Sequence, residues 1–210
     1  MIRKHKKTLI LTSLLTLLPT LVGLLLWNKL PETMITHFGF DGQPDGWSDV
    51  TTAVFVLPLI LLFFHWVCVL ADLKFSGNSQ QNPKLRTLVL WIIPILSNLC
   101  CGMMYALALG ADFPVTNIMF AFMGLMFIFI GNYLPKCPPS YTMGIKLPWT
   151  LSDDENWRKT HRMAGPIWVA GGIVMMASAV LKLPWLMIVA IVAMIFIPSI
   201  YSYLYFKRNH

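Results

Sequence analysis

The 210-residue sequence contains few charged side chains. Only 12% of its residues are charged, whereas 57% are apolar, and its mean hydropathy is +0.66. A soluble domain contains about 25% charged residues, so the composition excludes an ordinary soluble protein. The net charge of +7 could suggest nucleic-acid binding, but the basic residues flank apolar runs and do not coat one face. In a membrane protein this pattern reports orientation, and we expect no direct binding of nucleic acid.

The sequence also lacks the common catalytic and metal-binding motifs. It has no Gly-x-Ser-x-Gly, Walker loop, His-Glu-x-x-His or dinucleotide fingerprint. Its four Cys lie outside the segment expected to be extracellular, so no disulfide framework is expected. The acids Asp41, Asp45 and Asp49 stand four residues apart, and no Glu follows that could bind a cation through both oxygens. We therefore expect no enzymatic activity, no cofactor and no metal.

Six apolar runs are long enough to cross a bilayer, which takes about 20 residues in a helix. They cover residues 8–28, 50–71, 86–109, 113–134, 163–181 and 185–206. The first run lacks the small-residue cleavage site of a signal peptide, so we expect it to remain as a span. The sequence therefore predicts an all-α, polytopic integral membrane protein whose residues 1–210 form a single membrane domain.

The basic residues are distributed unevenly between the two sides of this arrangement. Of the 16 cationic residues, 14 lie at the termini, between the second and third spans, or between the fourth and fifth. Lys29 and Lys182 lie on the opposite side. Because cationic segments resist translocation, we predict that both termini are cytoplasmic and that residues 29–49 form an extracellular loop. Residues 135–162, called the signature loop below, are then cytoplasmic.

Two polar side chains, His65 and Asn98, fall within predicted spans. Polar groups at this depth are costly and face the bundle interior. One interpretation of His65 is a proton-sensitive role, because histidine changes charge near neutral pH. No Asp, Glu, Lys or Arg lies at depth to complete a relay, so we favour a hydrogen-bonded packing histidine. The same absence argues against an ion-coupled transporter. Gly102, Ala106 and Gly110 recur every four residues. Such a stripe lets another helix approach closely, either inside the bundle or across a dimer seam, and we favour packing inside the bundle.

The signature loop contains signals for a turn followed by a helix. Ser152 and Glu155 fit a capping box, which predicts a helix beginning at about Asp153. Pro148 favours extended geometry at the residue before it, so residues 144–149 should form an ordered, non-helical turn. The helix would lie at the cytoplasmic membrane interface, before the fifth span, and Pro166 would either begin that span or kink a continuous helix.

The predicted helix has two acid–base pairs, one aromatic face and one basic face. Its two acid-before-base pairs are Asp154–Arg158 and Glu155–Lys159. Trp157 and His161 share one stripe, and Arg158 and Arg162 share another. Two interpretations remain open. The helix could be an interfacial anchor, with rings among the lipid headgroups, or it could be a docking surface for a partner.

Three segments of this region resemble a known family. Gly-Asn-Tyr-Leu-Pro-Lys at 131–136, Gly-Ile-Lys-Leu-Pro-Trp-Thr-Leu at 144–151 and Trp-Arg-Lys-Thr-His-Arg at 157–162 are similar to the bacterial SdpI family. The family usually shows Gly-Ile-Arg-x-Pro-Trp-Thr-Leu, and here Lys146 keeps the charge of that Arg but loses its bidentate fork. Residues 30–47 resemble the small N-terminal module of many members, so the resemblance covers nearly the whole chain.

The resemblance implies a multi-pass protein of the bacterial plasma membrane that gives resistance to a secreted, membrane-active toxic peptide. It also implies that a cytoplasmic transcriptional repressor could be held at the membrane. The candidates for the family signature and partner binding are Asn132, Tyr133, Gly144, Lys146, Pro148, Trp149, Thr150, Trp157, Lys159, Thr160, His161 and Arg162. The outer-face candidates for toxin contact are His37, Phe38, Asp45 and Trp47. The alternative is a small-solute transporter, or another membrane protein without an immunity role.

Overall fold

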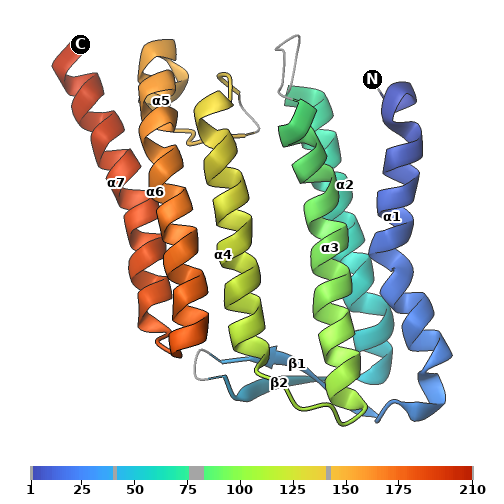
Figure 1. The fold of residues 1–210 in the computed structure, drawn as a ribbon. Helices are drawn as coiled ribbons and strands as arrows, with labels where there is room; N and C mark the ends of the chain where they lie inside the picture. Colours follow the sequence, from blue (N-terminus) through green and yellow to red (C-terminus); the bar gives the residue numbers. More distant parts are fainter. Residues whose placement is uncertain (1, 40–41, 76–82, 141–142, 210) are drawn as a thin grey trace. The chain divides into compact units, whose positions relative to one another are not determined.

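The computed structural model describes residues 2–39, 42–75, 83–140 and 143–209 (Figure 1). Among these residues, six helices are long and apolar enough to cross a membrane. They are α1 (Ile2–Leu25), α2 (Leu57–Phe75), α3 (Pro83–Ala108), α4 (Val115–Tyr133), α6 (Asp154–Leu181) and α7 (Trp185–Asn209). The prediction of an all-α, polytopic membrane protein with six spans is therefore confirmed.

The chain forms two compact units. The first comprises Met1–Lys74 and Arg86–Val115, and the second comprises Phe75–Leu85 and Thr116–His210. Short elements complete each unit. They are the 3-10 turns η1 (Trp27–Lys29) and η3 (Leu134–Lys136), the π-helical turn η2 (Thr52–Val56), the strands β1 (Thr33–Phe38) and β2 (Pro44–Asp49), and the one-turn helix α5 (Pro148–Leu151).

A β-hairpin lies between α1 and α2, where the sequence predicted only a polar loop. Strands β1 and β2 pair antiparallel, with Thr33 opposite Asp49 and Ile35 opposite Trp47. The sequence Pro-Asp-Gly-Trp-Ser-Asp of β2 is poor in residues that favour strands. Pairing with β1, and not local propensity, therefore makes this segment a strand.

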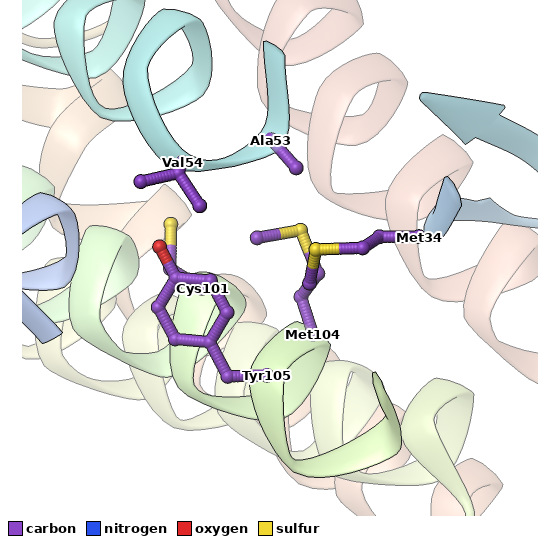
Figure 2. Close-up of a cluster of buried hydrophobic side chains, with 6 residues drawn as sticks. All are labelled: Met34, Ala53, Val54, Cys101, Met104 and Tyr105. Atoms are coloured by element: carbon purple, nitrogen blue, oxygen red, sulfur yellow. The ribbon is translucent and has the colours of Figure 1, made fainter. Parts of the chain in front are cut away.

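The hairpin is anchored to the first unit by Met34 (Figure 2). Only 1% of Met34 is exposed, and its side chain packs in one cluster with Ala53, Val54, Met104 and Tyr105. Burying a methionine side chain contributes about 2 kcal/mol. One face of the hairpin is thereby held against the helices.

The junction between the hairpin and α2 is held by hydrogen bonds. The carboxylate of Asp49 accepts from the backbone N–H of Thr52 at 2.9 Å and from its hydroxyl at 2.6 Å. These bonds favour the ionised carboxylate and lower the pKa of Asp49. In η2, the carbonyl of Val54 accepts from the Thr20 hydroxyl of α1 at 3.0 Å. The entry to α2 is thus fixed at the start and at the middle of the π-helical turn.

Helices α1 and α3 are joined by hydrogen bonds to carbonyls around Pro19. Because Pro19 has no N–H, the Leu15 carbonyl loses its helical partner. The Asn98 side-chain amide of α3 donates to this carbonyl at 2.7 Å and to the Pro94 carbonyl at 2.8 Å. Two further bonds to α1 carbonyls run from Ser97 to Thr16 and from Tyr105 to Pro19, each at 2.9 Å. A side chain of α3 therefore satisfies the carbonyl that Pro19 leaves without a helical partner, as burial in a membrane requires.

His65 of α2 is also buried, at 0% exposure, and faces α1. Its Nε2 lies 3.1 Å from the Thr12 hydroxyl, which itself donates to the Leu9 carbonyl at 3.2 Å. Because the hydroxyl hydrogen is used, the hydroxyl oxygen accepts from Nε2–H. Both intramembrane polar side chains are thus hydrogen-bonded between helices.

The bond from Asn98 leads to a testable expectation. We expect Asn98→Leu, which keeps the side-chain size, to lower the free energy of unfolding by about 1 kcal/mol, the usual scale for an interhelical bond in a membrane. Denaturation by detergent would measure it. In a Pro19→Ala background, the restored N–H can satisfy the Leu15 carbonyl, so Asn98→Leu should cost less. An equal loss in both backgrounds would contradict this account of Asn98.

In the second unit, α4 and α6 approach closely at two pairs of glycines. A Cβ on Gly124 would lie 2.5 Å from the carbonyl oxygen of Gly172, and a Cβ on Gly131 would lie 2.9 Å from that of Gly165. In each helix the two glycines are seven residues apart, which places them on the same face. Only glycine allows two backbones to pack at this distance.

The stripe of small residues predicted on α3 does not form a close helix contact of this kind. Gly102 of α3 is exposed, and a Cβ there would meet nothing within 4 Å, so the prediction of internal packing is wrong for this residue. The reason is the orientation of α3. Its Ser97 and Tyr105 face turns toward α1, to which both residues are hydrogen-bonded.

Candidate functional site

The signature loop leads directly into the fifth span. The expected interfacial helix is not separate, because α6 runs unbroken from Asp154 to Leu181 with Pro166 inside it. The helix is capped by Asp153, whose Oδ1 accepts from the N–H groups of Glu155 at 2.8 Å and Asn156 at 3.2 Å. The capping box from Ser152 is therefore wrong. Ser152 instead closes the preceding helix α5, and its hydroxyl donates to the Trp149 carbonyl at 3.4 Å.

The passage before α6 is partly helical. Leu147 is extended (φ −112°, ψ 153°), as predicted, but Pro148 and Trp149 begin α5 and are not part of a non-helical turn. Proline has the φ of a helix already and is favoured at its first position. The Thr150 hydroxyl accepts from the Leu147 N–H at 2.9 Å and donates to the Ile145 carbonyl at 2.8 Å. This threonine orders the turn that leads into α5.

The turn is attached to α6 at Gly144 and Ile145. Gly144 has φ +112°, and a Cβ there would lie 2.5 Å from Nε2 of His161 and 2.7 Å from the Trp157 ring. The next residue, Ile145, donates its N–H to His161 Nε2 at 2.8 Å. Glycine is needed both for the left-handed conformation and for the close approach.

Trp157 and His161 form the buried side of this attachment. Each is 1% exposed, and their rings stack with centroids 4.0 Å apart. The Trp157 indole N–H donates to the Cys137 carbonyl at 2.9 Å. Because His161 Nε2 accepts a hydrogen bond, Nδ1 carries the proton and donates to the Trp157 carbonyl at 2.8 Å. The imidazole is therefore neutral in this arrangement.

Cys137 contributes its backbone and not a reactive thiol. Its side chain is buried beside Trp157, and this burial raises the pKa of the Cys137 thiol to about 11. At neutral pH the thiol is protonated, and a protonated thiol is a poor nucleophile and metal ligand.

A buried polar network joins α5, α6 and α7. The Trp149 indole donates to the Ser202 hydroxyl at 2.7 Å, and this hydroxyl donates to Asn156 Oδ1 at 3.1 Å. The Asn156 amide returns a bond to the Ser202 carbonyl at 3.1 Å, and Thr160 also donates to Asn156 Oδ1, at 3.0 Å. A buried network satisfied in this way makes the packing specific and rigid. It holds the signature loop against the last helix.

The opposite stripe of α6 carries exposed charge. Glu155 and Lys159 pair at 3.4 Å, which confirms one predicted ion pair. Arg158 pairs with Glu155 and not with Asp154, so the other predicted pair is wrong. The Lys159 ammonium also lies over the Tyr205 ring of α7, 4.6 Å from its centroid. These contacts bring the start of α6 beside the end of α7.

The structure divides the predicted signature residues by exposure. The buried or half-buried members are Tyr133, Trp149, Thr150, Trp157, Thr160 and His161. The exposed members are Asn132, Gly144, Lys146, Pro148, Lys159 and Arg162. Burial of Trp157 disagrees with a ring placed among headgroups. Sequence reasoning missed Asn156 and Ser202, because single polar residues in a helix carry no signal of the partner they will meet.

Three of the four outer-face candidates share one surface of the hairpin. His37 and Asp45 are bonded through Nδ1 and Oδ1 at 2.5 Å, and both are exposed. Trp47 is 58% exposed and stands beside them. Phe38 is half-buried and pairs with Pro44 nearer the turn.

Comparison with known proteins shows that the segment containing the buried network matches a protein family. Residues 136–202 match the SdpI/YfhL protein family. The resemblance to the SdpI family is confirmed. This SdpI/YfhL segment begins in η3 and ends at Ser202, so it includes both the Trp157–His161 attachment and the network around Asn156.

Two further comparisons concern the rest of the chain. Residues 14–62 match a domain of unknown function (DUF1648), which here comprises the second half of α1, the hairpin and the beginning of α2. The chain is also 22% identical over 208 residues to Immunity protein SdpI of Bacillus subtilis (strain 168), covering 95% of this chain and 96% of that relative. No solved structure matches the chain significantly.

Proposed function

We propose that this protein gives its host resistance to a secreted peptide that attacks the bacterial plasma membrane from outside. The observation that carries the proposal is the extent of the match to Immunity protein SdpI, which covers 95% of this chain. The match is not confined to one module. At 95% coverage it extends over the hairpin, the membrane helices and the signature loop, and this extent supports a shared activity.

The charge distribution supports an orientation for this activity. With 14 of the 16 cationic residues on one side, the hairpin lies outside and both termini lie in the cytoplasm. The hairpin surface with His37, Asp45 and Trp47 then meets the peptide. The signature loop lies on the other side, where its buried residues anchor α5, α6 and α7.

A signalling role is the finer part of the proposal. Lys146, Lys159 and Arg162 are exposed within the signature loop, which the charge distribution assigns to the cytoplasm in this proposal. A basic surface of this kind suits an acidic surface on a cytoplasmic repressor. The toxin arrives on the opposite side, so this surface would serve the regulator and not toxin contact.

Expression in a bacterium without a cognate repressor tests resistance separately from signalling. We expect the full chain to raise the inhibitory concentration of at least one externally added membrane-active peptide about tenfold, because immunity does not need a regulator. Growth in a peptide panel would be the measurement, with membrane insertion of the protein checked by fractionation. Unchanged sensitivity to every peptide, despite normal insertion, would remove the basis of the proposed function.

A further inference from the structure

The hairpin presents one face to its surroundings while the other is anchored. Alternate residues of a strand point to opposite faces. On the anchored face Met34 is 1% exposed, whereas across the other face Ile35 stands opposite Trp47 and His37 is bonded to Asp45. These four residues, with Asp49 at the end of β2, are called the outward face below.

Trp47 is the centre of the outward face. It is 58% exposed, whereas the opposite face of the hairpin is packed against the helices through Met34. Ile35 lies directly across from it and extends the apolar surface. Along β2, Asp45 and Asp49 flank Trp47 at two-residue spacing, about 7 Å on each side. The outward face is thus an aromatic platform between two carboxylates.

The charge of the hairpin is opposite in sign to that of the whole chain. Among its described residues, 31–39 and 42–49, the acids are Glu32, Asp45 and Asp49, and His37 is the only side chain able to become cationic. The chain as a whole has a net charge of +7. The Thr52 bonds that lower the pKa of Asp49 keep this carboxylate ionised at neutral pH. The outward face therefore attracts positive charge.

We propose that the outward face binds a cationic amphipathic peptide, with an apolar side chain on Trp47 and Ile35 and basic side chains beside Asp45 and Asp49. The inference rests on the proposed function in placing the hairpin outside the cell, and it adds the chemical class of the peptide. Tryptophan provides both apolar contact area and an electron-rich ring for a cation. An anionic lipid surface fits less well, because it would repel the carboxylates.

Binding to the full-length protein in nanodiscs of zwitterionic lipid tests the inference. The probes are three synthetic amphipathic peptides of equal length and apolar content that are net positive, neutral or net negative. We expect the positive peptide to bind about tenfold more tightly than the other two. Trp47→Ala should weaken its binding about thirtyfold, as for an aromatic hot spot. Asp45→Asn should weaken it about threefold and reduce its dependence on salt.

Matched variants separate binding from folding. Trp185→Ala removes a tryptophan of similar exposure, 55%, at the start of α7 and should leave binding unchanged. Equal binding of all three peptides, or undiminished binding by Trp47→Ala, would overturn the inference. Brominated lipid without peptide provides a further test. If it quenches a component of the tryptophan fluorescence that Trp47→Ala removes, the inference is overturned, because the face is then covered by the bilayer.

The cellular assay distinguishes this inference from the proposed function. If the protein protects cells and Trp47→Ala protects them equally, the inference fails while the resistance function stands. If the positive peptide binds through Trp47 but no peptide in the panel is resisted, the outward face is a binding site and the resistance function fails.

Discussion

Gly172→Val is expected to lower the free energy of unfolding by about 3 kcal/mol or to prevent folding. A Cβ at Gly172 would lie 2.4 Å from the carbonyl oxygen of Gly124 and 2.9 Å from the backbone N of Ile128. Both are backbone atoms of α4, so neither can move aside by rotating a side chain. The two helices would have to separate, and the core between α4, α6 and α7 would lose contact.

Gly102→Val is the control for this change. It makes the same substitution in a membrane helix, but a Cβ at Gly102 would meet nothing within 4 Å. We expect its free energy of unfolding, measured by detergent denaturation, to stay within about 0.5 kcal/mol of the unaltered protein. If both variants lost stability equally, the close packing of α4 on α6 would not be the cause.

His161→Ala is expected to lower the free energy of unfolding by about 3 kcal/mol and to detach residues 143–147 from α6. The change removes the stacked ring beside Trp157 and leaves the Ile145 N–H without its acceptor. An N–H without a partner disfavours the docked segment, whereas water can satisfy it once the segment is released. Limited trypsin digestion at Lys146 would report the detachment directly, because this exposed lysine lies in the released segment.

Arg162→Ala provides the neighbouring control, since Arg162 is exposed and adjacent to His161. We expect it to leave both the free energy of unfolding and cleavage at Lys146 unchanged. Trp157→Phe is the complementary variant. It keeps an aromatic ring for stacking but loses the indole bond to the Cys137 carbonyl, at about 1 kcal/mol. Unchanged protection of Lys146 in His161→Ala would show that Ile145 is held by other contacts.

In the signature loop, local sequence patterns predicted some structural features and not others. The extended residue before Pro148 and the Glu155–Lys159 pair were predictable, because each depends on neighbours within one helical turn. The cap was misplaced by one residue, since Ser152 and Asp153 are both good caps and the choice depended on where α5 ended. The burial of Trp157 was also undecided locally, because it depends on a carbonyl 20 residues away.

The six spans and the uneven charge around them were determined by the sequence alone, since hydrophobic length and flanking charge are properties of continuous segments. Only the tertiary structure decided which polar and small residues meet. Asn98 satisfies a carbonyl 83 residues away, Trp149 bonds to Ser202 across 53 residues, and Gly124 faces Gly172. Residues 44–49 likewise form strand β2 only because they pair with β1. These features depend on helix rotation and strand pairing, which segments distant in the chain impose on one another.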